Sequence, residues 1–496
     1  MNLHEILSIL PEYSGVSLPL EQQQMEVSKV CVDSRQVESR SVFIAIRGSK
    51  FDSHNILNEI TNQNPLALIV EDRTNISQDF RGIVLVVKNT REALDKLSSR
   101  FFSDPSHRLM MFGVTGTNGK TSCTYLFEHI FNSVGFSTGV IGTINHHLGS
   151  KVWASETTTP GPIDLQGRLA EMRDLGAKAV AMEVSSHALD QHRADSVHFN
   201  VVLFTNLTLD HMDYHHDMKK YFAAKQRLFT ELLWKSNKIP QFAIVNIDDP
   251  NGKLLRVAGF ANLWTYGQSQ NSDFQFQVMG GDFSSTEFQL RTPFGDVKTK
   301  VPLCGLHNIY NVVGVLAATA GLGIPVEYGL RALQNFSGVP GRLQRAKSNR
   351  NLHVFIDYAH TPDALENVLQ ALQKVRKDIG LNNRIITLFG CGGDRDKGKR
   401  PEMAKVAEKY SDFVMVTSDN PRTENPMSII SDIMTGFKHS KPHIESDRRS
   451  AIAATLHQAR DGDVVLIAGK GHEDYQIIGN EKIHFSDLEV VQEMLS

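Results

Sequence analysis

Short apolar segments rich in β-branched residues alternate along the chain with longer segments in which apolar residues recur every three or four positions. Segments of the first kind are typical of buried strands, and those of the second kind are typical of amphipathic helices. Their alternation predicts parallel sheets that are covered by helices. Three such series can be separated, so we expect an α/β protein of three domains.

The first series covers residues 1–89 and is too short for a complete nucleotide-binding fold. We interpret it as a small N-terminal α/β domain. Its expected strands are residues 30–32, 42–46, 67–70 and 83–87.

The second series covers residues 90–340 and predicts a central parallel sheet. Its expected strands are residues 110–114, 178–184, 200–205 and 242–246. Between residues 273 and 302 the pattern changes to an alternation with period two, interrupted by Gly280-Gly281 and by residues 293–295. This change predicts a small antiparallel appendage on the central domain.

The third series covers residues 341–496 and follows the turn-rich segment 338–341, which has the composition of a linker. Its expected strands are residues 354–358, 385–389, 413–417 and 464–468. We expect a Rossmann-like α/β domain here.

Length and composition agree with a large globular enzyme. The chain has 496 residues, more than one hydrophobic core usually supports. Hydrophobic residues make up 41% and charged residues 22%, and the formal net charge is -3. Without a basic excess, we do not expect nucleic acid as a partner.

Two further features bear on the cellular compartment. Residues 1–10 include His4 and Glu5 and do not resemble a signal peptide, and no apolar run is long enough to span a membrane. The four cysteines are scattered without paired spacing: Cys31, Cys123, Cys304 and Cys391. We therefore expect a cytoplasmic protein with reduced thiols and no membrane partner.

The strongest motif is Gly-Val-Thr-Gly-Thr-Asn-Gly-Lys-Thr at residues 113–121, between an apolar strand and the amphipathic segment 122–134. A glycine-rich turn at the start of a helix exposes backbone N–H groups to phosphates. Lys120 can reach the terminal phosphates, and Thr121 can ligate Mg²⁺. Five residues rather than four separate Gly113 from Gly119. We predict an ATP site; the alternative is a tight turn without a ligand.

The sequence of this loop resembles that of the Mur ligase family, and further blocks in the same order extend the resemblance over nearly the whole chain. The central blocks are residues 183–187, 191–193, Asn206, Asp210-His211, Tyr214-His215, and Leu306-His307-Asn308 with Asn311. The later blocks, residues 357–362, 390–400, 419–422 and 469–473, are similar to those of the diaminopimelate-adding branch. The resemblance implies an ATP-dependent ligase of cell-wall synthesis.

In such a ligase ATP phosphorylates a carboxylate, and an amine then attacks the acyl phosphate. The charge that develops on the phosphate oxygens calls for Mg²⁺ and fixed cationic donors. The resemblance implies that Lys120, Glu183, His211 and Lys225 are catalytic, and that Thr121, Glu183, His211 and Lys225 hold Mg²⁺. Lys225 is implied to be carbamylated, as N6-carboxylysine. The residues implied for ATP binding are Thr115, Gly116, Thr117, Asn118, Gly119, Lys120, Thr121, Asn308, Arg342 and Asp357.

Several of these residues have plainer explanations. Glu183, at the end of an apolar strand, could face solvent, and Lys225 on a helix could be an ordinary surface lysine. The histidines 211, 215 and 216 could indicate zinc, although a phosphate-binding environment suits Mg²⁺ better. We predict only His211 of these three as a ligand.

The resemblance also implies where the substrates bind. The UDP-N-acetylmuramoyl-dipeptide is expected on Val32, Ser34, Ser49, Lys50, Phe51, Thr157, Thr158, Thr159, Ser185, Gln191 and Arg193. The loop at residues 51–54 and Thr157 depart from the family pattern, and a run of hydroxyls such as Thr157–Thr159 could be only a capped loop.

Meso-diaminopimelate differs from lysine by a second carboxylate, which the planar guanidinium of Arg422 can bind through paired donors. The alternative is a turn with an exposed arginine. The residues expected to bind the amino acid are Arg395, Asp419, Asn420, Pro421, Arg422, Gly469 and Glu473.

We expect a monomer that acts on ATP, the UDP-linked dipeptide and meso-diaminopimelate. The enzymatic alternatives are a lysine-adding ligase of the same family and a ligase like folylpolyglutamate synthase. The non-enzymatic alternative is a nucleotide-gated protein that binds the cell-wall precursor. Such a protein has no need of Lys120, His211 and Lys225, all of which are present.

Overall fold

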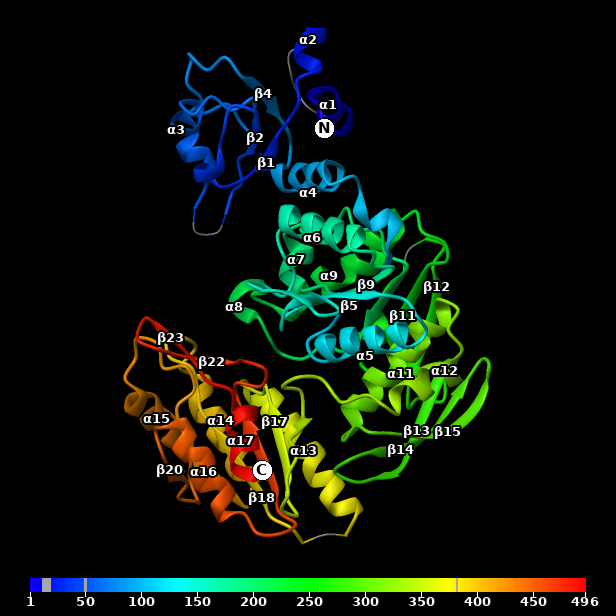
Figure 1. Ribbon diagram of the computed structural model, residues 1–496, viewed down its shortest axis with the longest axis vertical. Helices are drawn as coiled ribbons and strands as arrows, with labels where there is room; N and C mark the ends of the chain where they lie inside the picture. The colour runs from blue at the N-terminus through cyan, green and yellow to red at the C-terminus, as the bar shows by residue number, and fades with distance from the viewer. Residues whose placement is uncertain (11–18, 49–50, 258, 381) are drawn as a thin grey trace. The chain divides into compact units, whose positions relative to one another are not determined.

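The computed structural model describes residues 1–10, 19–48, 51–257, 259–380 and 382–496 (Figure 1). Its internal contacts define two compact units. The first contains residues 1–120, 131–245 and 251–263, and the second contains residues 121–130, 246–250 and 264–496. The division into domains at residues 89 and 340 remains a prediction.

The N-terminal region of the first unit is a parallel sheet whose four strands confirm the predicted ones. The strand order is β1 (Lys29–Cys31), β2 (Ser41–Ile44), β3 (Ala67–Val70) and β4 (Ile83–Val86). Because side chains alternate along a strand, Val42 and Ile44 belong to one buried cluster and Phe43 to another. The helices of this region are α1 (Leu3–Ile9), α2 (Leu20–Gln23), α3 (Leu57–Thr61) and α4 (Thr90–Phe101).

The central sheet begins with the predicted parallel strands. In spatial order these are β11 (Phe242–Asn246), β10 (Val201–Phe204), β5 (Met110–Thr115) and β9 (Ala179–Glu183). A further parallel strand that the sequence did not predict, β6 (Thr138–Ile141), follows β9. Two antiparallel strands that the sequence did not predict, β7 (His146–Leu148) and β8 (Lys151–Trp153), extend the sheet and make it mixed. The helices are α5 (Lys120–Ser133), α6 (Pro162–Asp174), α7 (Ser186–Asp190), α8 (Met212–His215), α9 (Met218–Arg227) and α10 (Leu233–Lys235).

The predicted antiparallel appendage is present in the second unit. Strands β13 (Phe274–Gly281), β14 (Thr286–Thr292) and β15 (Gly295–Val301) pair antiparallel, with a register shift between Val278 and Gly280. Strand β12 (Asn262–Gly267) runs parallel to β13. Two helices follow, α11 (Leu306–Gly321) and α12 (Val326–Leu333).

The C-terminal region is a Rossmann-like α/β fold, as predicted. The sheet order is β16 (Gln344–Arg345), β17 (His353–Asp357), β21 (Val464–Ala468), β18 (Ile385–Phe389), β19 (Phe413–Val416) and β20 (His443–Ile444). All neighbouring strands except β16 and β17 pair parallel. A two-stranded hairpin, β22 (Tyr475–Ile478) and β23 (Glu481–His484), lies outside this sheet.

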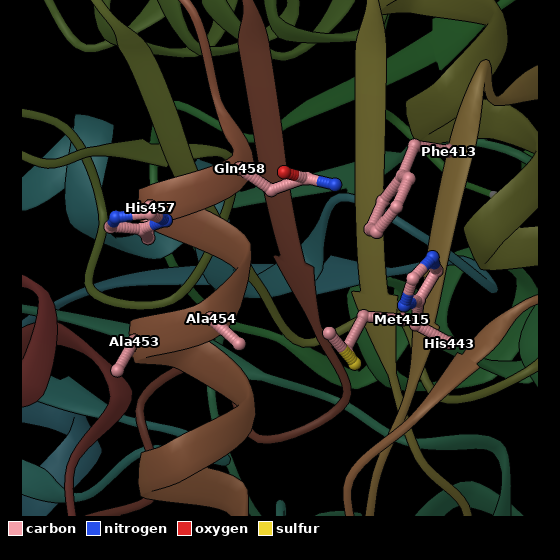
Figure 2. A pocket seen from close by; sticks show the side chains of 7 residues that line it. All are labelled: Phe413, Met415, His443, Ala453, Ala454, His457 and Gln458. Atoms are coloured by element: carbon pink, nitrogen blue, oxygen red, sulfur yellow. The ribbon is translucent and has the colours of Figure 1, made fainter.

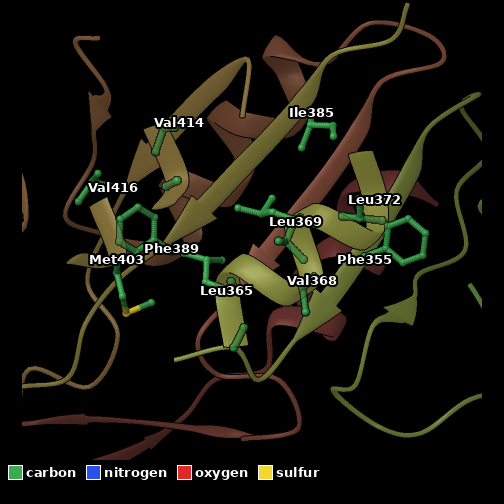
Figure 3. Packing of buried hydrophobic residues seen from close by; sticks show 14 of the residues in the cluster. Phe355, Leu365, Val368, Leu369, Leu372, Ile385, Phe389, Met403, Val414 and Val416 are labelled. Atoms are coloured by element: carbon green, nitrogen blue, oxygen red, sulfur yellow. The ribbon is translucent and has the colours of Figure 1, made fainter. Parts of the chain in front are cut away.

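Buried clusters on both faces hold the helices of this region. On one face Leu365, Leu369 and Leu372 of α13 (Pro362–Asp378) pack on strand residues such as Phe355 and Ile385 (Figure 3). Helices α14 (Lys399–Tyr410) and α15 (Pro426–Met434) contribute to the same cluster, whereas α16 (Arg448–Gln458) and α17 (Asp487–Leu495) contribute to the other. The loops after the parallel strands therefore lie at one edge of the sheet, where ligands bind in such folds.

Candidate active site

The glycine-rich loop connects β5 to α5, as the sequence predicts. Two backbone N–H groups of the loop donate to Asn206. That of Thr117 donates to the backbone carbonyl and that of Asn118 to Oδ1, each at 2.9 Å. Gly116 has a φ of 150°, and a Cβ there would lie 1.9 Å from Thr205 Oγ1. The loop therefore requires glycine at this position.

The ammonium group of Lys120 lies over the loop. Its Nζ donates to the carbonyl oxygens of Gly116 at 2.9 Å and Thr117 at 2.8 Å. These contacts hold a positive charge beside the exposed end of α5, where phosphates bind.

Glu183 is buried at the end of β9, so the solvent-facing explanation is wrong. Only 1% of the residue is exposed. Its carboxylate accepts hydrogen bonds from the Thr143 backbone N–H at 2.9 Å and the Thr143 hydroxyl at 3.1 Å. A Cβ on Gly142 would lie 2.4 Å from Glu183 Oε1, so the backbone approaches the carboxylate closely. A carboxylate at this position suits a metal ligand.

Lys225 is also buried, with 1% exposure, so it is not an ordinary surface lysine. Its Nζ donates to the Gly116 carbonyl at 2.8 Å and lies 4.5 Å from the centre of the Tyr221 ring. Burial, and then the charge of Lys120, lower the pKa of Lys225 well below its usual value, while Asp210 acts in the opposite direction. A neutral, nucleophilic amine is the form that reacts with CO₂.

The three histidines near α8 differ in their partners and in their exposure. His211 adopts a φ of 55° and lies 3.4 Å from Asp210, whereas the His215 ring contacts the Ser186 hydroxyl at 2.9 Å. His216 is exposed. Across the described residues, no group of three or more His, Cys, Asp or Glu side chains is placed to hold a metal ion. The zinc explanation therefore has no support in the described structure.

The remaining residues predicted for ATP lie in the second unit. Arg342 donates to the Thr121 hydroxyl at 3.3 Å and lies over the Tyr358 ring. Asp357 accepts from the backbone N–H groups of Leu343 and Ala359, and burial raises its pKa. The Asn308 amide donates to the Cys304 carbonyl at 2.8 Å, at the start of α11.

Some of the residues predicted for the UDP-linked substrate form one connected group. Arg193 donates to the Thr159 carbonyl at 2.9 Å and to Gln191 Oε1 at 2.6 Å. The Thr159 hydroxyl in turn accepts from the Ser185 backbone N–H at 3.0 Å. The Thr158 hydroxyl lies 3.0 Å from the Thr143 hydroxyl, which in turn donates to the Glu183 carboxylate.

The other residues predicted for that substrate are less connected. Thr157 is exposed and donates to the Thr159 carbonyl. Val32 and Ser34 follow β1 in the N-terminal sheet, and Phe51 is 57% exposed. Ser49 and Lys50 lie outside the described residues.

The residues predicted for the amino acid lie on loops after β18, β19 and β21. The Asn420 amide donates to the Glu473 carboxylate at 2.8 Å, which joins two of the loops. Arg422 has a φ of 52°, is partly buried and donates to the Gly393 carbonyl at 2.9 Å, so it is more than a turn residue in solvent. A Cβ on Gly392 would lie 3.0 Å from Arg422 Nη1 and 3.8 Å from Arg395 Cγ, so both arginines flank Gly392.

Asp419, Pro421 and Gly469 complete this set and are all buried. Asp419 Oδ1 is shielded from solvent and makes no hydrogen bond within the described residues, although Lys470 lies 3.7 Å away. A buried carboxylate oxygen without a donor at this place suits an incoming ammonium group.

Sequence reasoning missed the supports of these loops. The β22–β23 hairpin binds them directly: Gln476 donates to the Asp419 carbonyl at 2.6 Å, and Arg422 N–H donates to the Ile477 carbonyl. The buried Lys470 donates to Asn420 Oδ1 at 3.2 Å and Glu473 Oε2 at 3.1 Å. Lys470 was visible in the motif at residues 469–473, but the hairpin gives too short a pattern to predict.

A pocket of about 500 Å³ opens elsewhere, between α16 and strands β19 and β20 (Figure 2). Its walls are formed by Phe413, Met415, His443, Ala453, Ala454, His457 and Gln458. None of these residues was predicted for the site. Phe413 lies at the start of β19, whereas the loop with Asp419 follows the end of that strand.

Comparison with known proteins identifies the family of this chain. The model of the Mur ligase middle domain matches residues 114–319, and that of the Mur ligase, glutamate ligase domain matches residues 341–471. The chain belongs to the Mur ligase family, whose members are ATP-dependent ligases.

Several relatives within this family carry the name of one particular ligase. The chain is 41% identical over 482 residues to "UDP-N-acetylmuramoyl-L-alanyl-D-glutamate--2,6-diaminopimelate ligase" of Geobacter sulfurreducens, covering 94% of this chain and 93% of that protein. The protein of the same name from Aquifex aeolicus is 41% identical, covering 98% and 97%. A solved structure with that name has a TM-score of 0.72 at 29% identity, covering 100% of this chain and 98% of the other.

A folylpolyglutamate synthase from Mycobacterium tuberculosis, with a TM-score of 0.60 at 16% identity, covers 76% of this chain and 92% of its own. At that identity the likeness shows a shared fold. No helix among the described residues is long and apolar enough to cross a membrane.

Proposed function

We propose that this chain is an ATP-dependent ligase that joins meso-2,6-diaminopimelate to the D-glutamate of UDP-N-acetylmuramoyl-L-alanyl-D-glutamate in peptidoglycan synthesis. The observation that carries the proposal is the identity of about 40%, over nearly the full length, to several ligases with this reaction in their names. The solved folylpolyglutamate synthase, by contrast, is 16% identical to this chain.

In the first step a carboxylate oxygen of D-glutamate attacks the γ-phosphorus of ATP. The new O–P bond forms as the bond to the β-phosphate oxygen breaks, which gives an acyl phosphate and ADP. Lys120 and the N–H groups at the start of α5 neutralise the charge on the phosphate oxygens, where fixed donors are most effective.

In the second step the amine of diaminopimelate attacks the acyl carbon. The C–N bond forms, the C–O bond to phosphate breaks, and inorganic phosphate leaves, while the nitrogen loses one proton to solvent or buffer. The residues of the C-terminal loops hold the amino acid at a fixed place for this attack, which lowers the entropic part of the barrier.

The donor set fits Mg²⁺ better than a transition metal. Glu183, Thr121 and His211 provide isolated oxygen and nitrogen donors, and Mg²⁺ commonly takes one or two carboxylates together with substrate phosphates. Mg²⁺, when bound there, supplies positive charge beside the phosphates. We include Lys225 in the set as a carbamate: its neutral nitrogen bonds to the carbon of CO₂ and releases one proton, which converts a buried amine to an anionic ligand.

For the two organic substrates, we assign the predicted residues as follows. Thr158, Thr159, Ser185, Gln191 and Arg193 bind the muramoyl-dipeptide. Their connected hydrogen bonds, described above, support this assignment. Val32, Ser34, Ser49, Lys50 and Phe51 contact the UDP part, with Thr157 beside the dipeptide.

In the amino-acid pocket, Arg422 and Arg395 bind the carboxylates of diaminopimelate, and Glu473 with Asp419 faces its ammonium group. The flanking of Gly392 by both arginines supports this arrangement. We assign Asn420, Pro421 and Gly469 to the walls of the pocket.

We further propose three domains, of residues 1–89, 90–340 and 341–496, in a monomeric enzyme. The second family match begins at residue 341, which supports the second boundary. ATP and a UDP-linked precursor are metabolites of the cytoplasm, where the enzyme is proposed to act. Light scattering after gel filtration measures the oligomeric state.

Amino-acid selectivity tests the proposed reaction. Wild-type protein should release phosphate from ATP only with the UDP-linked dipeptide and diaminopimelate together, and lysine should be a poor substitute. Arg422→Ala should weaken diaminopimelate binding by about 3–5 kcal/mol, because it leaves a buried carboxylate without its partner. This cost corresponds to about two to three and a half decades in affinity.

Arg376→Ala, which removes a surface ion pair with Asp412, is the control and should keep wild-type selectivity. Efficient addition of lysine by the wild type, or full diaminopimelate selectivity in Arg422→Ala, would show that the substrate assignment is wrong. Precursor binding without any phosphate release would instead favour the non-enzymatic alternative.

A further inference from the structure

Arg448, the first residue of α16, has a buried guanidinium that reaches two loops of the proposed amino-acid pocket. Only 1% of Arg448 is exposed to solvent. Nη1 donates to the Ser418 carbonyl at 3.2 Å, and Nη2 donates to the Ala468 carbonyl at 3.1 Å. Ser418 immediately precedes Asp419, and Ala468 immediately precedes Gly469. Arg448 therefore binds the bases of both loops.

Asp487, the first residue of α17, fixes the orientation of this guanidinium. Its Oδ1 accepts from Arg448 Nε and its Oδ2 from Nη2, both at 2.7 Å, and the side chain of Asp487 is fully buried. A paired contact of this kind defines the plane of the guanidinium as well as its position. The two carbonyls are therefore held by a group that cannot rotate freely.

The sheet itself does not fix the two loops to each other directly. Strands β19 and β21, which lead into them, are not neighbours, because β18 lies between them. Two strand spacings separate them, about 10 Å. Arg448 bridges this separation at the bases of the loops, and Lys470 joins Asn420 to Glu473.

We propose that Arg448, held by Asp487, is a positioning residue for the amino-acid substrate: it sets the distance between the loop with Asp419 and Arg422 and the loop with Gly469 and Glu473. This inference rests on the proposed function, because it concerns the same pocket. A buried ion pair contributes little net stability compared with well-packed apolar residues, so stability alone is a weak reason for this pair.

The decisive variant is the double substitution Arg448→Met with Asp487→Leu, which removes both charges and keeps apolar volume between the helices. We expect it to fold, as checked by circular dichroism and thermal melting. Its KM for diaminopimelate should rise about 10- to 100-fold, because small misplacements of binding groups are costly. Its KM values for ATP and for the UDP-linked dipeptide should stay within about twofold, since the partners of the guanidinium other than Asp487 are carbonyls at the amino-acid loops.

Arg448→Lys supplies a second measurement that does not depend on the double variant folding. A lysine ammonium cannot hold Asp487 and both carbonyls in one plane, so the same selective rise in the KM for diaminopimelate is expected. The matched control is Arg449→Ala, which removes an exposed ion pair with Glu493 across the same two helices and should leave all three KM values unchanged.

An unchanged KM for the amino acid in folded variants, or an equal rise in all three KM values, would overturn the proposal. The wild-type assay separates this failure from failure of the proposed function. If wild type adds a different amino acid, the reaction assignment falls, and the KM for the amino acid that it does add then tests Arg448 in the same way.

Discussion

At the scale of single residues, burial distinguishes the proposed catalytic groups from ordinary surface residues. Glu183 and Lys225 are both 1% exposed and lie close to the phosphate loop. The sequence placed each on the right kind of element, but only the structure shows that their polar ends are removed from water. Desolvation of this kind is typical of functional groups.

Lys225→Ala should lose nearly all ligase activity while remaining folded, because no carbamate can form. Millimolar formate or acetate should restore part of the turnover by supplying an anionic oxygen in the vacated space. Lys219→Ala, an exposed position on the same helix, is the control and should behave as wild type. Full turnover of Lys225→Ala at saturating Mg²⁺ would remove Lys225 from the proposed metal set.

Asp95 on α4 should make the folded state less stable as the pH rises. Only 1% of Asp95 is exposed to solvent. The Ser196 hydroxyl donates to its Oδ2, whereas its Oδ1 has no hydrogen-bond partner within the described structure. Burial raises the pKa of Asp95 to about 8, despite the hydrogen bond from Ser196. The unfolded-state pKa is about 3.9, so the folded state binds more protons between these values and stability falls as the pH increases through that range.

Asp95→Asn removes this dependence and should raise the free energy of unfolding by up to about 4 kcal/mol at pH 7, with a much smaller gain at pH 4. Urea titrations at several pH values measure it. The exposed Asp79→Asn is the control. A gain that does not depend on pH would mean that Asp95 is ionised in the folded protein.

At the scale of elements, the strands were predictable and their supports were not. Continuous apolar runs such as those of β5, β10 and β21 can be recognised in the sequence, because a buried parallel strand needs apolar residues on both faces. Strands β7, β8, β22 and β23 have three or four residues each and carry polar side chains, so no periodicity marks them. Their place depends on tertiary contacts, such as those of Gln476 with the loop after β19.

The same limit applies to the site. The phosphate loop could be predicted because its glycines and Lys120 are contiguous. Arg448 could not be connected with Asp487 from spacing, since 38 residues separate them and only the fold brings them together. Burial of Arg448 among carbonyl groups has no signature in one sequence.

The phosphate loop gives a prediction at this scale. Gly116→Ala should abolish ATP binding or weaken it at least about 100-fold, because the new methyl group would overlap Thr205 and distort the loop whose geometry preorganises the site. Gly135→Ala is a demanding control: Gly135 also has a positive φ, 87°, but nothing lies within 4 Å of the added Cβ. Calorimetry measures the affinity of each variant for a non-hydrolysable ATP analogue. Equal losses of affinity in the two variants would mean that backbone strain alone, and not overlap with Thr205, causes the loss.

At the scale of the whole molecule, the two compact units should respond to different substrates. The residues proposed for the UDP-linked dipeptide lie in the first unit, and those proposed for diaminopimelate lie in the second. A ligand at 100 times its Kd stabilises the unit that binds it by about 2.7 kcal/mol. Scanning calorimetry should therefore resolve two transitions, of which each ligand alone raises a different one.

Bovine serum albumin with the same ligands controls for changes in buffer composition. Diaminopimelate that raises only the transition raised by the UDP-linked dipeptide would contradict the assignment of the substrates to separate units. A single transition that both ligands raise equally would contradict thermal independence of the units.

The four cysteines, all among the described residues, are buried and form no disulfide, and they are distributed over the fold. Cys31 lies in β1, Cys123 in α5, Cys304 before α11 and Cys391 after β18. A thiol reagent can reach each of them only when its own part of the chain opens. The rate at which each native thiol is labelled therefore reports how often its region opens. Mass spectrometry of the labelled peptides would measure these rates with and without substrates, and no engineered probe is needed.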